Sequence, residues 1–156
     1  MSIAARLKGF LDEQQIKYTL LAHSPAYTAQ EAAATLHVPG KELAKTVVVK
    51  AEGKLALAVL PASYRVNTKL LAEAAGVKKV ELATENEFSA TFPDCELGAM
   101  PPFGNLYDLP VYVDEALTQD EEIVFHAGTH RDAIRMRFLD FARLVAPRTA
   151  RFAERR

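Results

Sequence analysis

The stretch from Leu43 to Lys50, Leu-Ala-Lys-Thr-Val-Val-Val-Lys, constrains the fold of this chain more than any other. Three consecutive valines favour a packed, pleated strand. A second apolar run follows after Glu52-Gly53, a two-residue turn in which glycine supplies positive φ. The pattern therefore predicts an antiparallel hairpin of strands 45–51 and 54–60. Because the second strand is apolar on both faces, we expect it to be a central strand covered on two sides.

Lys45 stands at the entry of the first strand of this hairpin. It alternates in phase with Val47 and Val49, so the period of two sends its side chain to their face. If that face is the core, the buried ammonium needs an anionic partner or a chemical role to offset its desolvation. The alternative is an edge-strand lysine whose stem covers apolar surface while its head stays in water. Spacing alone leaves both readings open.

Helical and strand patterns alternate along the rest of the chain. Helices are expected at 2–15, 29–36, 68–75, 85–91 and 140–145, and further strands at 17–21, 80–83, 109–113, 122–128 and 133–138. The pattern predicts an α+β domain with a curled, largely antiparallel, barrel-like sheet of about six or seven strands flanked by helices. We expect one domain over residues 1–147 and a basic, partly frayed C-terminal tail over 148–156.

Composition and net charge limit the kinds of partner that the chain can bind. The chain has 156 residues and a net charge of −1, so a nucleic-acid partner would have to meet a local basic patch. Arg135 and Arg137 alternate outward on the last strand, either as contacts to phosphates or as a solvated strand face. No apolar run approaches the ~20 residues of a membrane span, and no secretory signal is evident. A single cysteine, Cys95, agrees with a cytoplasmic protein.

The segment from Pro93 to Asn105 is the least regular, and it contains Gly98-Ala99-Met100-Pro101-Pro102-Phe103-Gly104. Backbone N–H groups beside a glycine can form an anion or oxyanion nest, although Pro-Pro removes two donors. A plain rigid connector is an equally good interpretation. No metal-ligand spacing and no cofactor-binding fingerprint occurs, and the four histidines are scattered. Neighbouring carboxylates would raise the pKa of the Cys95 thiol, which makes it a poor nucleophile.

Three elements in order give the chain a family resemblance. They are the strand around Lys45, the Gly98–Gly104 loop, and Val111-Tyr112-Val113-Asp114 followed by His126-Ala127-Gly128. Over about residues 3–147 the chain resembles the YbaK/EbsC family, the freestanding relatives of the editing domain inserted in bacterial prolyl-tRNA synthetase. The lysine strand and the Gly-x-x-x-Pro loop are the specific parts of this resemblance.

The resemblance implies a set of site residues. The family's lysine falls on Lys45, and its loop falls on Gly98 and Pro102 with Ala99 beside them; we expect Lys45, Gly98 and Ala99 to be catalytic. The expected substrate-binding residues are Met100, Pro101, Pro102, Phe103, Asp114, Ala127 and Gly128. Asp114 would either anchor the ammonium of a bound amino acid or cap a turn. Met100, Pro101 and Phe103 replace residues that are often small or aliphatic in the family, which points to a different substrate choice.

The resemblance also implies an activity. It is the hydrolysis, in trans, of the ester of a mischarged tRNA carrying a small amino acid, with no cofactor or metal. The partners would be the tRNA acceptor end and an aminoacyl-tRNA synthetase, with no membrane involved. The alternative is a non-catalytic module of the same fold that binds an acceptor end or a nucleotide, because a lysine and a glycine loop serve binding as well as hydrolysis.

Overall fold

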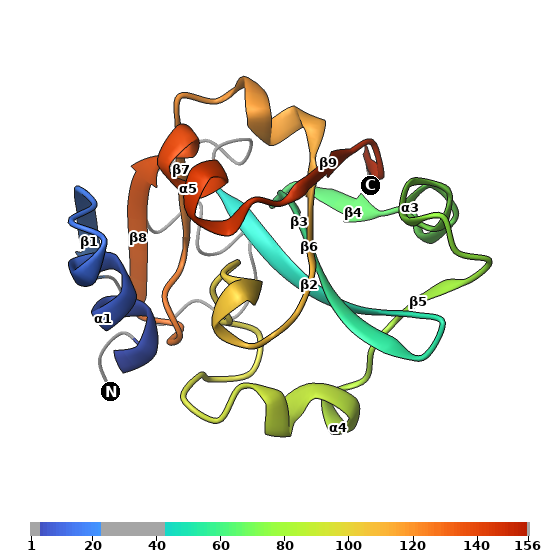
Figure 1. Cartoon of the computed structure of the whole chain (residues 1–156), viewed down its shortest axis with the longest axis horizontal. Coiled ribbons are helices and arrows are strands. Elements are labelled where there is room, and N and C mark those ends of the chain that lie inside the picture. Colours follow the sequence, from blue (N-terminus) through green and yellow to red (C-terminus); the bar gives the residue numbers. More distant parts are fainter. Residues whose placement is uncertain (1–3, 23–42, 156) are drawn as a thin grey trace.

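The computed structural model of the chain describes residues 4–22 and 43–155 (Figure 1). The helix expected at 29–36, and with it His23 and His37, lies outside these residues. The helical segments are α1 (Ala5–Glu13), α3 (Thr68–Ala75), α4 (Glu85–Phe88), η1 (Ser89–Thr91), η2 (Gly104–Leu106), η3 (Glu115–Gln119) and α5 (Phe138–Val145). Among the described helices, none has the length and apolar character needed to cross a membrane.

The strands are β1 (Tyr18–Ala22), β2 (Ala44–Ala51), β3 (Lys54–Pro61), β4 (Tyr64–Val66), β5 (Val80–Leu82), β6 (Val111–Asp114), β7 (Glu122–His126), β8 (Asp132–Arg137), β9 (Arg148–Ala150) and β10 (Ala153–Arg155). The predicted hairpin is confirmed, because β2 and β3 pair antiparallel from Ala44 opposite Pro61 to Ala51 opposite Lys54. Both turn residues, Glu52 and Gly53, have positive φ, as a tight two-residue hairpin turn requires.

Strand β3 is covered on both faces, as its sequence predicts. Leu57 and Val59 belong to one hydrophobic cluster, called here the first core, which also contains Val48, Phe103 and Phe125. Ala58 and Leu60 belong to the second core, which is built with Val49, Leu71, Tyr112 and Phe152. Successive side chains of β3 therefore point alternately into the first and the second core.

A second sheet, in the order β1-β8-β7, lies beside the central sheet, whose order is β5-β2-β3-β6-β9. The two sheets meet where Leu43, just before β2, bridges Val124 of β7 in parallel. Figure 1 shows β1, β8 and α1 at one end of the molecule and α3 with β5 at the other. The first core lies between the two sheets, because Ile134 and Met136 of β8 join Leu57 and Val113 in it.

The expected barrel-like closure is wrong. The described strands are divided among three sheets, the third being a ribbon of β4 and β10. Strand β6 pairs with β3 in parallel, and β9 pairs with β6 in parallel, so the central sheet mixes directions instead of meandering. The single bridge at Leu43 joins the sheets at one point and does not close them into a ring.

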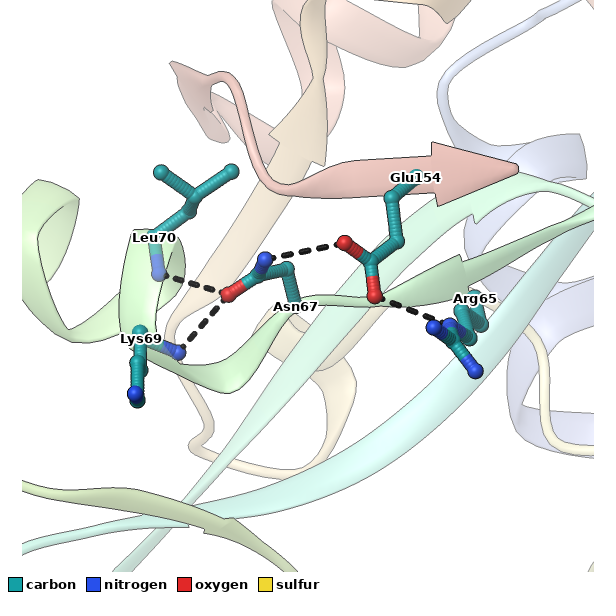
Figure 2. A network of polar contacts seen from close by, with 5 residues as sticks. All are labelled: Arg65, Asn67, Lys69, Leu70 and Glu154. Atoms are coloured by element: carbon teal, nitrogen blue, oxygen red, sulfur yellow. Dashed lines mark hydrogen bonds and ion pairs between the residues drawn. The ribbon is translucent and has the colours of Figure 1, made fainter. Parts of the chain in front are cut away.

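Residues 148–155 are not a frayed tail, which corrects the sequence-based expectation for this segment. Strand β9 extends the central sheet, and β10 pairs with β4. Phe152 between them is fully buried in the second core. Figure 2 shows Glu154 accepting hydrogen bonds from Arg65 Nε at 2.8 Å and Asn67 Nδ2 at 3.0 Å. Asn67 Oδ1 in turn caps α3 by accepting the N–H groups of Lys69 and Leu70, so the tail is joined to the start of that helix.

Replacing Phe152 with alanine should lower the free energy of unfolding by about 3–5 kcal/mol, the usual loss for a buried phenylalanine. Urea unfolding followed by circular dichroism measures it. The neighbouring Arg151→Ala, at an exposed position, is the control and should stay within about 0.5 kcal/mol of the parent. A loss below about 1 kcal/mol in Phe152→Ala would show that the tail contributes little to the core.

Candidate functional site

The loop that carries Gly98 is held against the turn between β7 and β8. The Glu96 N–H donates to the Gly128 carbonyl at 2.7 Å, and the Gly128 N–H donates to the Ala99 carbonyl at 2.9 Å. Gly128 is therefore joined by a pair of backbone hydrogen bonds to Glu96 and Ala99, the residues on either side of Leu97 and Gly98. Ala4, the residue before α1, also contacts this junction, because its N–H donates a hydrogen bond to the Ala127 carbonyl at 2.8 Å.

Two glycines are required at this junction. Gly98 has a φ of +86°, and a Cβ on it would lie 3.3 Å from His130 Cε1. Gly128 has a φ of +102°, and a Cβ there would lie 2.9 Å from the Ala4 Cβ. Positive φ strains any residue with a Cβ, so each position favours glycine through both backbone conformation and space.

His130 and Glu96 are central to the junction, and sequence reasoning did not single them out. His130 is buried, and its Nε2 lies 2.7 Å from the Leu97 carbonyl oxygen. A carbonyl can only accept, so this nitrogen carries the proton in the hydrogen bond. The His130 N–H donates to Glu96 Oε1 at 2.7 Å. No local pattern in the sequence signals that this turn packs against the loop.

The two N–H groups predicted as oxyanion donors differ in availability. The Ala99 N–H donates to the Glu96 carbonyl at 3.0 Å and closes a turn. The Gly98 N–H donates to Met100 Sδ at 3.2 Å. A thioether is a weak acceptor, so a stronger acceptor can displace Met100 from Gly98 at little cost. The Gly98 N–H is thus the more available of the two donors.

The remaining loop residues pack inward. Met100 is 5% exposed and Phe103 is fully buried, both within the first core. The Phe103 ring lies 5.5 Å from that of Phe125 and 5.6 Å from that of Phe141, measured between centroids. Pro101 and Pro102 are also buried. The loop is therefore rigid, and Phe103 contributes to the core.

Lys45 lies at the start of β2, two residues after the bridge between Leu43 and Val124. Its predicted phase is confirmed, because Val47 and Val49 both pack in the second core. Met100 and Phe103 pack in the first core, on the other side of the central sheet. The Lys45 side chain is half-buried, and it lies on the face of β2 opposite to the one that packs against the Gly98 loop.

Asp114 is buried, and three backbone N–H groups surround its carboxylate. Its Oδ1 accepts from Phe152 at 2.9 Å and Ala153 at 2.8 Å, and its Oδ2 accepts from Ala116 at 2.9 Å. These contacts favour the capping role of the two roles expected for Asp114, since they fix the start of η3 and the C-terminal residues. Within the described residues, no three His, Cys, Asp or Glu side chains lie close enough together to hold a metal ion.

Comparison with known proteins decides the family. The profile of the aminoacyl-tRNA editing domain matches residues 23–144, which include Lys45, the Gly98 loop, Asp114 and Gly128. The chain belongs to the aminoacyl-tRNA editing domain family. The resemblance predicted from the three motifs is thereby confirmed.

Relatives of this editing domain occur both inside larger enzymes and as separate proteins. Proline–tRNA ligases of Bacillus mycoides strain KBAB4 and Bacillus cereus strain G9842 are each 26% identical over 106 residues, covering 68% of this chain and 19% of the ligase. The chain thus spans about a fifth of the length of these ligases.

Solved structures share the fold over nearly the whole chain. A hypothetical protein superposes with a TM-score of 0.86 at 24% identity over 96% of this chain and 99% of its own. A protein described as a candidate trans-editing enzyme for prolyl-tRNA synthetase superposes with a TM-score of 0.82 at 25% identity, over 97% of this chain and 96% of its own.

The single cysteine of the editing domain lies just before the loop. Burial raises the pKa of Cys95 to about 11, with a smaller contribution from Asp94, while the Tyr107 hydroxyl acts in the opposite direction. The Cys95 Sγ lies 3.4 Å from the Tyr107 hydroxyl, which donates to Asp94 Oδ1 at 2.9 Å. The expectation of a poorly nucleophilic thiol agrees with this environment, although burial outweighs the carboxylates as its cause.

Because the raised pKa keeps Cys95 protonated, its alkylation by iodoacetamide should be slow at neutral pH and should rise about tenfold per unit up to about pH 10. Mass spectrometry of timed reactions measures the rate, and circular dichroism verifies folding at each pH. An unstructured cysteine peptide is the control, since its rate should level off near pH 9. A plateau at that same pH in the protein would contradict the buried thiol.

Proposed function

We propose that this domain hydrolyses, in trans, the ester bond of a mischarged tRNA carrying a small amino acid. The observation that carries the proposal is the junction of the Gly98 loop with the β7–β8 turn, in which paired hydrogen bonds fix Gly98 with its N–H held by only a thioether. Membership of the editing-domain family supplies the substrate class. The likeness to a candidate trans-editing enzyme supports action on a separately charged tRNA.

In this mechanism water attacks the ester directly. The water oxygen forms a bond to the carbonyl carbon, and the carbonyl π electrons move to oxygen to give a tetrahedral oxyanion. The Gly98 N–H leaves Met100 Sδ and donates to that oxyanion, a contribution typically worth ~10²–10³ in rate. Collapse breaks the bond to the ribose oxygen, which takes up the proton that the attacking water loses, and the free amino acid leaves.

Lys45 provides positive charge at the entrance of the site. It binds the terminal adenosine's phosphate or the developing negative charge, and its ammonium stays charged beside either anion. Ala127 and Gly128 form the wall behind the loop, and Asp114 maintains the neighbouring strand ends through its backbone contacts. Specificity for a small amino acid comes from pocket volume, since one methylene is worth only about 1–3 kcal/mol.

A second function is favoured by one observation. In the structure the Ala99 N–H is already used by Glu96, and the Gly98 N–H is in contact with Met100. A site whose donors are occupied suits a non-catalytic module that binds the acceptor end through Lys45. Such a module would bind mischarged tRNA saturably and release no amino acid.

A panel of mischarged tRNAs, assayed for release of free amino acid, tests the proposal. Wild-type protein should hydrolyse at least one tRNA that carries a small amino acid, and Lys45→Ala should reduce that rate by about 10–100-fold, because a charge-assisted contact is lost. Lys54→Ala at the exposed start of β3 is the control. Binding without turnover across the whole panel would leave only the second function.

Gly98→Ala should reduce the deacylation rate by about 10²-fold, because the strained loop and the crowded His130 displace the oxyanion donor. Gly53→Ala is a closely matched control, since Gly53 has a φ of +83° with nothing within 4 Å of an added Cβ. It should lose a similar ~1–2 kcal/mol of stability and keep its activity. Steady-state kinetics and thermal melting separate the two effects; equal activity in both variants would remove Gly98 from the mechanism.

A further inference from the structure

Three cations share the outer face of the β1–β8 pair. Ile134 and Met136 of β8 are buried in the first core, so the alternate residues Arg135 and Arg137 project from the opposite face. Arg135 is opposite Thr19 of β1, and Lys17 precedes Tyr18, which is opposite Met136. Lys17, Tyr18, Thr19, Glu122, Arg135, Met136 and Arg137 line a hollow of about 230 Å³, which we call the basic hollow.

The charges of the basic hollow are not neutralised by ion pairs. Within residues 4–22 and 43–155, ion pairs neutralise other cations, such as Lys50 with Glu81 and Glu87, but they include none of the three cations of the hollow. One carboxylate, Glu122, lines the hollow beside Lys17, Arg135 and Arg137. This surface is therefore positively charged on a protein whose net charge is −1, which is the local patch that an anionic partner requires.

We propose that the basic hollow binds the sugar–phosphate backbone of the tRNA substrate. Two guanidinium groups on neighbouring outward positions of one strand suit phosphate, since each can donate two parallel hydrogen bonds. The strand is rigid because it is paired on both sides, with β1 and with β7. The backbone that carries the two arginines is therefore held in place before RNA arrives.

The position of the hollow fits this partner. Strand β8 begins at Asp132, beside the turn that holds the Gly98 loop, and ends at Arg137. Five residue steps of a strand span about 17 Å, so the hollow lies several nucleotides away from a ribose bound at the loop. This inference rests on the proposed function for the placement of the tRNA end, but not for the binding itself.

A rival basic surface lies at the other end of the molecule. Lys69, Lys78 and Lys79 line a hollow of about 100 Å³ between α3 and β5, far from β8 in Figure 1. This hollow is smaller than the basic hollow, and no arginine lines it. The Lys79 Nζ also lies 3.7 Å from the Glu81 Oε2. Neutralising its three lysines removes the same formal charge as neutralising the basic hollow, which makes it a matched control.

The test is equilibrium binding of uncharged tRNA over a range of salt concentrations. The variant Lys17→Gln/Arg135→Gln/Arg137→Gln should lower the slope of log affinity against log salt by about 2–3, since each lost phosphate contact removes ~0.7–0.9. Its affinity at low salt should fall about tenfold or more. The variant Lys69→Gln/Lys78→Gln/Lys79→Gln should bind like the wild type, and Arg135→Lys/Arg137→Lys should keep most of the slope, because the charge remains.

Two results would overturn the proposal. One is an unchanged salt slope in Lys17→Gln/Arg135→Gln/Arg137→Gln. The other is an equal loss of tRNA affinity in both triple variants, which would indicate a response to net charge alone. Arg137→Gln, at an exposed position, is the fallback if the triple variant melts early, and its slope should fall by about 1. Since the tRNA carries no amino acid, a wild-type protein that binds through the hollow but releases no amino acid contradicts only the proposed function. If both hold, the first variant raises KM for mischarged tRNA and leaves kcat unchanged.

Discussion

Strand β3 is buried on both faces, and the arrangement of the other elements follows from that burial. From Leu55 to Pro61 the side chains of this strand are all apolar, so the strand must be covered on both faces and the domain needs two cores. The first core recruits the β1-β8-β7 sheet and α1, and the second recruits α3 and the C-terminal residues around Phe152. Strand β3 pairs with β2 along one edge and with β6 along the other. Those two strands therefore also lie between the two cores.

The two parts of the predicted site lie on different sides of the central sheet. Lys45 and the Gly98 loop belong to opposite sides of the central sheet, so a pocket that includes both cannot lie over one face. Among the described strands, β7 bridges the chain at Leu43, just before β2, and β5 pairs with β2 only from Val49 onward. The segment after Leu43 is thus the place where the two sheets diverge.

Local signals account for the parts of the structure that the sequence predicted well. The Glu52-Gly53 turn, and the helix between Asn67 and Gly76, each depend on residues within a few positions of one another. The parallel pairing of β6 with β3 depends on contacts about fifty residues apart, and nothing in four residues of Val-Tyr-Val-Asp encodes its direction. Strands β9 and β10 have only three residues each and carry charges, so their sequence resembled a solvated terminus.

The candidate site, like the fold, could be predicted only in part. Its glycines could be named because a family pattern marks them, but their partners could not. Glu96 and His130 act through contacts that exist only once the loop and the turn meet, with Glu96 accepting the His130 N–H and His130 holding the Leu97 carbonyl. Loop rigidity here has three sources of different kinds: buried prolines, paired backbone hydrogen bonds and a histidine beneath the glycine. A loop fixed in this way holds the Gly98 N–H in one orientation, and preorganised donors avoid the reorganisation that flexible ones must undergo as charge develops.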